Sequence, residues 1–430
     1  MGVRARRVFD SRGRPTVEAE VALAGGAVGR AIAPAGASRG SREAIDLRDG
    51  GARFGGFDVA AAIGNVAGPI AGALRGADAL DQAGCDARLV ALDGTATKSR
   101  LGGNATVAAS MAVAHAAAAA RRLPLWESLA GGAPVTLPLP EIQIFGGGAH
   151  AGRRIDVQDL MVMPVGATTF AEAVEIVTDV YRAAGELLAA QGRLAGVADE
   201  GGWWPAFDSN EQALEALLRS IERSGRRPGA DVAISLDVAA SEFGRDGVYT
   251  LGLERRRLDR DGMCAMLLDW IGRYPIASIE DPLAEDDAEG WRAFARAAAG
   301  RVQLIGDDYL VTSAARVEDA AAQRACNALL VKPNQAGTLT EARAALDAAR
   351  RHGFATIVSA RSGETEDVTI AHLAVGWNAG QLKVGSFARG ERTAKWNEVL
   401  RIEEALGARA RFAGAAALPV RWPPRSGSEP

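Results

Sequence analysis

The feature that most constrains the fold is a repeated unit in the C-terminal part of the chain. A short apolar segment ends at a polar residue and is followed by a helical pattern, and the unit recurs with ends at Asp237, Glu280, Asp307, Lys332, Ser359 and Lys383. Strands that alternate with helices in this way are typical of a parallel sheet closed into a barrel. The long interval after the first unit contains an extra hairpin, FGRDGVYTL. We therefore predict a β/α barrel.

The N-terminal part has a different pattern. Extended segments separated by turn residues predict an antiparallel meander over residues 3–9, 16–24 and 26–32. Helical periodicity then follows over residues 57–74, 79–92 and 104–120. This part is expected to be a small α+β domain.

The predicted fold class is therefore α/β, with a smaller α+β domain preceding the barrel. We place the N-terminal domain at residues 1–133 and the barrel domain at residues 134–420. Residues 421–430, RWPPRSGSEP, are rich in Pro and Ser and are expected to form a disordered tail.

Three carboxylates follow successive predicted strands. Because the carboxyl ends of barrel strands meet at one mouth, Asp237, Glu280 and Asp307 should converge there. Carboxylates without histidine partners suit a hard divalent cation such as Mg²⁺, and one or two ions are possible at such a mouth. The alternative is that each acid caps the helix that follows it. Three acids in succession favour the metal site.

The lysines are conspicuous because they are rare. The chain has 49 Lys and Arg residues, of which only four are lysines: Lys98, Lys332, Lys383 and Lys395. A buried ammonium can lose its proton, whereas a guanidinium cannot. Lys332 and Lys383 close apolar strands and should face the three acids. We expect Lys332 to act as a base, with Lys383 holding a substrate carboxylate and lowering the pKa of its neighbour.

A metal and a lysine base at one mouth suggest removal of a proton next to a carboxylate, because a dication stabilises the enolate that forms. Other stretches near strand ends carry candidate substrate residues. Arg361 and Ser362 suit a phosphate or phosphonate. The remaining candidates are Glu200 in ADEGG, His150, Gln158 and Asp159 in GGGAHAGRRIDVQD, and Ser38 in the loop PAGASRGS, which is expected to close as a lid.

Six motifs in order along residues 3–415 resemble the enolase (phosphopyruvate hydratase) family: VFDSRGRPTVE, PAGASRG, ADEGG, SIEDPLAEDD, LLVKPNQAGTL and SARSGETED. The resemblance implies a homodimer and a barrel whose early strands depart from simple alternation. It implies that Asp237, Glu280 and Asp307 bind Mg²⁺, and that Lys332 removes the C2 proton of a substrate like 2-phosphoglycerate. Glu200 would then protonate the leaving hydroxyl. Arg361 and Ser362 would hold the phosphate, and Ser38 would reach a second Mg²⁺.

The sequence departs from the family pattern on the leaving-group side. Asp159 replaces a longer glutamate, and Ala360 stands where a histidine is expected. The other departures are Arg39, Phe145, Ala149, Trp203, Trp204 and Pro333. The metal and base residues match the family, whereas the leaving-group side differs. This contrast favours a specialised relative such as carboxyphosphonoenolpyruvate synthase of phosphonate biosynthesis, with Arg39 and the two tryptophans contacting an added group.

Two alternatives are an ordinary enolase that converts 2-phosphoglycerate to phosphoenolpyruvate, and a non-catalytic binding protein. A sugar-acid dehydratase is disfavoured because Arg361 and Ser362 would have no phosphate to bind. The net charge of −4 gives no reason to expect nucleic acid or an anionic membrane as a partner. Three widely spaced cysteines and the lack of an apolar leader or spanning segment indicate a cytoplasmic protein.

Overall fold

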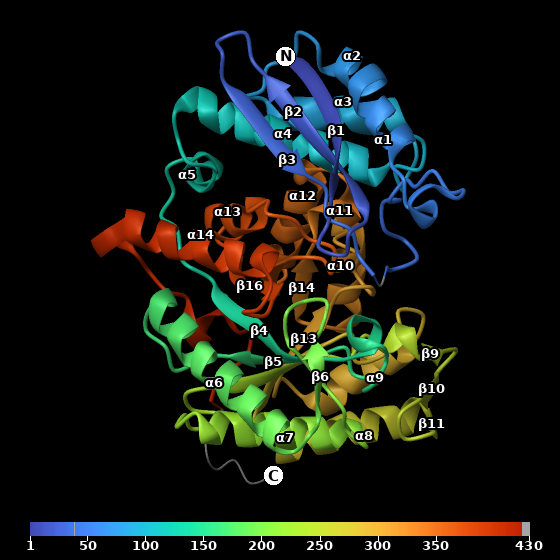
Figure 1. The fold of residues 1–430 in the computed structure, drawn as a ribbon, viewed down its shortest axis with the longest axis vertical. Coiled ribbons are helices and arrows are strands. Elements are labelled where there is room, and N and C mark those ends of the chain that lie inside the picture. The colour runs from blue at the N-terminus through green and yellow to red at the C-terminus, as the bar shows by residue number, and fades with distance from the viewer. Residues whose placement is uncertain (38, 424–430) are drawn as a thin grey trace.

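A computed structural model of the chain describes residues 1–37 and 39–423. Figure 1 shows the N-terminal strands and helices at one end of the molecule and the barrel with its surrounding helices below them. The N-terminal elements are β1 (Gly2–Phe9), β2 (Pro15–Ala22), β3 (Val28–Ile32), α1 (Ala60–Asn65), α2 (Ala71–Leu74), α3 (Gln82–Asp93), α4 (Gly103–Arg121) and α5 (Leu125–Ala130). The predicted antiparallel meander is confirmed, with sheet order β1-β2-β3.

Helix α4 is the centre of the N-terminal part. It is buried along most of its length and packs against β2 and β3. Gly29 permits this close approach, since a Cβ there would lie 2.1 Å from the backbone nitrogen of Ala116. The single helix predicted over residues 57–74 is wrong in detail. A π-helical segment, Val66–Ile70, separates α1 from α2, and Pro69 within it lacks the N–H that a regular α-helix would use.

Eight strands close the barrel in the order β4-β5-β8-β12-β13-β14-β15-β16, with β16 paired to β4. The bounds of these strands are β4 (Leu139–Gly146), β5 (Asp159–Met163), β8 (Ala233–Asp237), β12 (Ile276–Glu280), β13 (Gln303–Gly306), β14 (Ala328–Val331), β15 (Ala355–Ser359) and β16 (Gly380–Gly385). Strands β8 and β12 to β14 are buried along their whole length, as expected for parallel strands covered by helices. The predicted α/β fold, a β/α barrel preceded by a smaller domain, is confirmed.

The barrel departs from regular alternation at its start. Strand β5 is antiparallel to both of its neighbours, β4 and β8. A hairpin of β6 (Leu194–Val197) and β7 (Trp203–Pro205) joins the edge of β4. The predicted extra hairpin is present as part of a separate small sheet of β9 (Gly244–Arg245), β10 (Val248–Leu251) and β11 (Arg256–Asp259).

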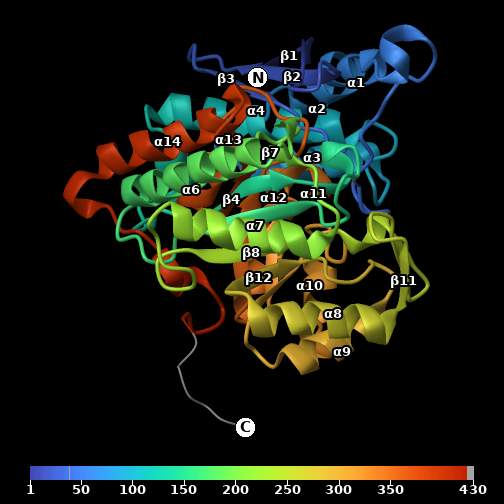
Figure 2. The same ribbon diagram turned by 60° about the horizontal axis from the view of Figure 1, so that its bottom comes forward.

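Helices cover the outside of the barrel, and Figure 2 shows α6, α7 and α8 lying across it. Their bounds are α6 (Phe170–Ala190), α7 (Asn210–Arg223), α8 (Arg260–Arg273), α9 (Ala288–Ala298), α10 (Ala314–Gln323), α11 (Pro333–Ala336), α12 (Leu339–Arg351), α13 (Thr369–Gly376) and α14 (Gly390–Leu406). Several begin at a residue whose side chain accepts a hydrogen bond from a backbone N–H three residues later: Thr169, Ser209, Asp259, Asp287 and Thr338. None of the described helices combines the length and apolar character needed to cross a bilayer.

The predicted disordered tail is wrong at its start. The indole nitrogen of Trp422 donates to the carbonyl of Gly229 at 2.9 Å, and Trp422 packs against an apolar cluster at the amino-terminal end of the barrel strands. The partly buried ring of Trp422 therefore contacts the barrel. The rest of the predicted tail, residues 424–430, lies outside the described residues.

Candidate active site

The carboxyl ends of the parallel strands bring the predicted charged residues to one mouth. Asp237 and Glu280 are the last residues of β8 and β12, while Asp307 and Lys332 directly follow β13 and β14. Lys383 lies within β16 and is level with Ser359, the last residue of β15. None of these three acids provides the helix cap that was the alternative explanation, since the caps are other residues.

The reversed direction of β5 brings a second group to the same mouth. Asp159 is the first residue of β5 and pairs in register with Asp237, the last residue of β8. Gln158, just before β5, donates from its amide nitrogen to Asp237 Oδ2 at 3.1 Å. An antiparallel strand therefore contributes its amino-terminal end to a site that the other strands build with their carboxyl ends.

Most of the predicted site residues line one pocket, together with Gly36, Ser359, Ala360 and Val384. They are His150, Gln158, Asp159, Glu200, Asp237, Lys332, Arg361, Ser362 and Lys383. Glu280 and Asp307 contact this group through the two lysines. Ser38 lies outside the described residues, so its predicted lid role has no structural description.

Lys383 lies between the first two predicted metal ligands. Its Nζ is 2.8 Å from both Asp237 Oδ2 and Glu280 Oε2, and 3.7 Å from Asp159 Oδ2. Burial raises the pKa of Glu280 well above its usual value, and the nearby charge of Asp237 adds to this effect. Burial alone would lower the pKa of Lys383, but the surrounding carboxylates outweigh it and the pKa is raised well above its usual value.

Lys332 forms a buried ion pair with Asp307, whose other oxygen accepts a hydrogen bond from Gln335 at 2.8 Å. The prediction of a lowered pKa at Lys332 is wrong for this arrangement. Burial and the neighbouring Arg361 and Lys383 do favour the neutral amine, but the Asp307 carboxylate outweighs them and the pKa of Lys332 is raised. In this arrangement the Asp307 carboxylate therefore favours the protonated form of Lys332.

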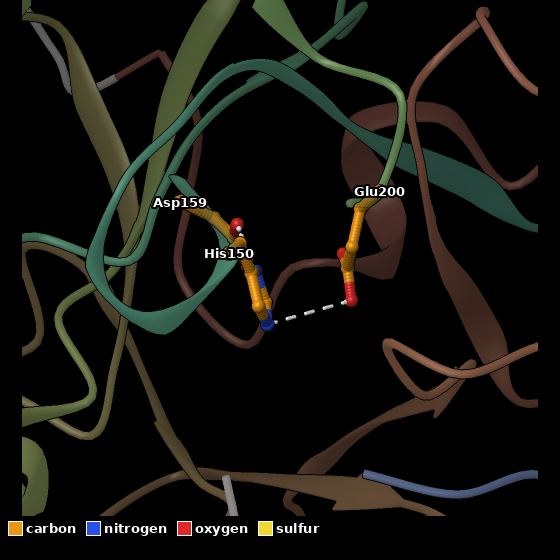
Figure 3. A group of neighbouring side chains, drawn as sticks. All are labelled: His150, Asp159 and Glu200. Atoms are coloured by element: carbon orange, nitrogen blue, oxygen red, sulfur yellow. Dashed lines mark hydrogen bonds and ion pairs between the residues drawn. The ribbon is translucent and has the colours of Figure 1, made fainter. Parts of the chain in front are cut away.

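His150, Asp159 and Glu200 form a second buried group in the lining of the pocket (Figure 3). His150 Nδ1 is 3.2 Å from Asp159 Oδ1, and His150 Nε2 is 3.8 Å from Glu200 Oε1. Burial lowers the pKa of His150, but Glu200 and Asp159 outweigh it and raise the pKa to about 9. Burial raises the pKa of Asp159, yet the charge and hydrogen bond of His150 bring it below the usual value. The protonated imidazole of His150 is therefore favoured beside Asp159 and Glu200.

The carboxylates of the mouth fit a divalent cation. Among the described residues, two groups of three potential ligands have donor atoms within 4.8 Å of one another: His150, Asp159 and Glu200, and Asp281, Asp307 and Asp308. The predicted set of Asp237, Glu280 and Asp307 is not one of these groups; Lys383 contacts Asp237 and Glu280, and Lys332 contacts Asp307. The set nevertheless has the hard oxygen donors that Mg²⁺ prefers, and Glu280 Oε1 is buried with no hydrogen-bond partner among the described residues.

The phosphate side of the site depends on a contact with the N-terminal part. Arg361 forms a two-point ion pair with Glu43, which follows the lid loop. The hydroxyl of Ser362 accepts from the backbone nitrogen of Ala37 at 2.6 Å and from Arg12 at 3.3 Å. Ala37, next to Ser38, therefore contacts Ser362 directly, while Glu43, which follows the loop, contacts Arg361.

Several residues that organise the site were missed by sequence analysis. Glu43 and Gln143 carry no recognisable local signal, because their partners are distant in sequence. Gln335 and Asp281 did have a signal, since Gln335 lies within LLVKPNQAGTL beside Lys332 and Asp281 lies within SIEDPLAEDD beside Glu280. Asp281 accepts from the backbone nitrogens of Asp307 and Asp308 at 2.9 and 2.8 Å and shapes the turn after β13.

The suggested contacts of Trp203, Trp204 and Arg39 with an added substrate group are not supported. None of the three lines the pocket. Trp203 stacks on Tyr181 with ring centres 4.6 Å apart, and its nitrogen donates to the carbonyl of Tyr181. The Trp204 ring packs near Gly152, and Arg39 is exposed with its nearest acid, Asp46, at 4.0 Å. The Trp203 ring thus packs β7 against α6.

Comparison with known proteins identifies both parts of the chain. Residues 1–129 match the family model of the enolase N-terminal domain, and residues 134–420 match that of the enolase C-terminal TIM barrel domain. A protein named Enolase 1 from Desulfitobacterium hafniense (strain Y51) is 50% identical over 413 residues, which cover 95% of this chain and 94% of that protein. The predicted resemblance is therefore confirmed, and the chain is a member of the enolase family of lyases.

Proposed function

We propose that this protein catalyses the Mg²⁺-dependent, reversible dehydration of 2-phosphoglycerate to phosphoenolpyruvate. The observation that carries the proposal is the placement of Lys332 and Glu200 around one pocket that also contains Arg361. This arrangement supplies a base, an acid and a phosphate-binding cation to one small substrate. The similarity to a protein named Enolase 1 over nearly the whole chain supports the same reaction.

Asp237, Glu280 and Asp307 would hold Mg²⁺. When bound, the cation would neutralise the negative charge of the substrate carboxylate and of Asp307, which favours both the enolate and the neutral form of Lys332. Lys383 would hold the substrate carboxylate from β16. Arg361, Ser362 and Gln158 would orient the remaining polar groups, with Ser38 approaching from the lid loop. The roles of Asp237, Lys383, Arg361, Ser362 and Gln158 are supported by their places in the lining of the pocket.

The reaction has two bond-breaking steps. In the first, Lys332 Nζ accepts the proton from C2, and the electrons of that bond form the enolate. In the second, the bond between C3 and its hydroxyl breaks, and Glu200, which must be in its protonated form for this step, supplies the proton with which the hydroxyl leaves as water. His150 and Asp159 lie beside Glu200 and stabilise the charges of this half of the site. Each of the two proton transfers thus has its own residue: Lys332 acts at C2, and Glu200 acts at the hydroxyl on C3.

The group-transfer interpretation, carboxyphosphonoenolpyruvate synthase, has less support than the ordinary enolase reaction. The relative that matches most of the chain is named an enolase, and the residues suggested for an added substrate group do not line the pocket. The replacements at Asp159 and Ala360 are the features that would favour a changed reaction. A non-catalytic binding protein is disfavoured because the buried charged groups face one another.

Turnover by the purified protein tests the proposal. We expect formation of phosphoenolpyruvate from 2-phosphoglycerate with Mg²⁺, none with a chelator, and a loss of at least ~100-fold in Lys332→Ala. The wild-type protein could instead be inactive, with turnover gained in a variant that combines Asp159→Glu with Ala360→His. That result would show that Asp159 and Ala360 adapt the site to another reaction. A wild-type protein inactive under every condition would contradict the proposal.

We also propose that the protein is a homodimer, as the family resemblance implies. Exposed aromatic side chains in the N-terminal part agree with an interface there, since Phe9 is 52% exposed and Phe54 is 41% exposed, with ring centres 5.8 Å apart. Light scattering should give twice the chain mass of 44.6 kDa. A mass of one chain at micromolar concentration would contradict the dimer.

A further inference from the structure

The side chain of Gln143 connects the start of β5 to the turn before β7 and does not line the pocket itself. It lies in β4 and is fully buried. Its amide nitrogen donates to Asp159 Oδ1 at the start of β5, and its amide oxygen accepts from the backbone nitrogen of Gly202 at 2.8 Å. Both ends of one side chain are therefore bonded to segments that carry site residues.

The two partners of Gln143 lead to opposite ends of the group in Figure 3. Asp159 Oδ1 contacts His150 Nδ1 at 3.2 Å, and His150 Nε2 faces Glu200 Oε1 at 3.8 Å. Gly202 lies two residues after Glu200 in the same tight turn, where Ala198 also bonds to Gly202. A closed chain of contacts thus runs from Gln143 through Asp159, His150 and Glu200 back to the turn.

The space around Gln143 leaves it little freedom to move. A Cβ at Gly202 would lie 2.4 Å from the amide oxygen of Gln143, so only glycine fits beside it. The turn is also fixed from other sides, because Tyr181 donates to the carbonyl of Gly201 at 3.0 Å and Ser386 donates to the carbonyl of Glu200 at 2.8 Å. The position of Asp159 relative to this fixed turn therefore depends on the length of the Gln143 side chain.

We propose that Gln143 is a positioning residue that sets the separation between the Asp159 and Glu200 carboxylates. This inference rests on the proposed function and assigns Gln143 to the water-loss half of the reaction. The side chain of Gln143 has two methylenes and that of Asp159 has one. Their combined length spans the distance between the backbone of β4 at residue 143 and the backbone of β5 at residue 159. Moving one methylene from residue 143 to residue 159 should preserve that sum, whereas changing either residue alone should not.

A double-mutant cycle tests this length relationship. Gln143→Asn and Asp159→Glu should each lower kcat for dehydration by about 10- to 100-fold, since displacement of a catalytic group by about 1 Å has effects of this size. KM should stay within about twofold because neither change alters the phosphate-binding residues. The double variant should recover to within about threefold of the wild type, which a merely structural role would not produce.

Gln303 provides a matched control. It is also fully buried in the barrel, but it lies at the start of β13 and bonds to Ser278 and Gln381, away from the mouth. Gln303→Asn creates a vacancy of the same size and should leave kcat within about twofold of the wild type. A Gln143→Asn variant no slower than Gln303→Asn, or a double variant no faster than the slower single variant, would overturn the inference.

A measurement that needs no turnover separates this inference from the proposed function. The ring nitrogens of His150, which face Asp159 and Glu200 with the charge of Asp237 nearby, report the position of Asp159 through their NMR titration. Gln143→Asn should lower the pKa of His150 by about one unit, and the double variant should restore it. An inactive wild type with this response would reject the dehydration and keep the positioning role. An unchanged His150 titration in Gln143→Asn would overturn the positioning role, whatever the activity.

Discussion

Arg361 and Glu43 form a buried two-point ion pair that joins the end of β15 to the N-terminal part of the molecule. The two nitrogen–oxygen distances are 2.8 and 3.2 Å, and the side chains are only 3% and 5% exposed. Gln335, which bonds to Asp307, also donates to Glu43 at 3.2 Å. The Glu43 carboxylate therefore contacts Arg361 directly and is connected to Asp307 through Gln335.

Glu43→Gln should lower the free energy of unfolding by about 3 kcal/mol, because it removes the carboxylate that forms the buried two-point ion pair with Arg361. Thermal or denaturant unfolding measures this loss. Glu20→Gln is the control, since the Glu20–Arg6 pair is solvent-exposed and its loss should change stability little. Equal stability of Glu43→Gln and the wild type would show that the pair does not hold the two parts together.

Glu280→Gln should abolish the stabilisation of the protein by Mg²⁺. A bound ligand at 100 times its Kd stabilises the folded state by about 2.7 kcal/mol, so the wild type should melt at a higher temperature as Mg²⁺ is added. Glu141→Gln is a matched control, because Glu141 is equally buried but bonds to Ser235 inside the barrel. If Glu280→Gln responded to Mg²⁺ as the wild type does, Glu280 would not be a ligand.

His372 should make the protein less stable as the pH falls from 6.5 towards 4. Burial lowers the pKa of His372 to about 4, and the neighbouring His115 on α4 adds to this, although Glu398 on α14 and Asp367 oppose it. The unfolded chain therefore binds more protons than the folded chain in this window, so the stability present above pH 6.5 is progressively lost below it. The loss should be on the order of 2 kcal/mol.

Denaturant unfolding across this pH window checks the effect of His372. His372→Gln should flatten the pH dependence relative to the wild type, whereas His352→Gln, which changes an exposed histidine, should leave it unchanged. Parallel pH curves for the wild type and His372→Gln would contradict the role of this buried imidazole.

The main part of the site was predictable because it depends on strand spacing. Asp237, Glu280, Asp307 and Lys332 end parallel strands, and parallel strands place their carboxyl ends together. Asp159 was a candidate from its glycine-rich stretch, but strand spacing could not place it at the mouth, because an antiparallel β5 breaks the repeat. The Glu43–Arg361 contact spans 318 residues and leaves no local pattern. The raised pKa of Lys332 depends on which carboxylate lies beside it, and a sequence does not specify that contact.

The central claim is that Lys332 removes the C2 proton independently of Glu200. Exchange of the C2 hydrogen of 2-phosphoglycerate with deuterated solvent tests it most directly, because exchange needs the base but no loss of water. The wild type should catalyse exchange, Glu200→Gln should retain exchange while losing phosphoenolpyruvate formation, and Lys332→Ala should lose both. Exchange at the wild-type rate in Lys332→Ala would contradict the account.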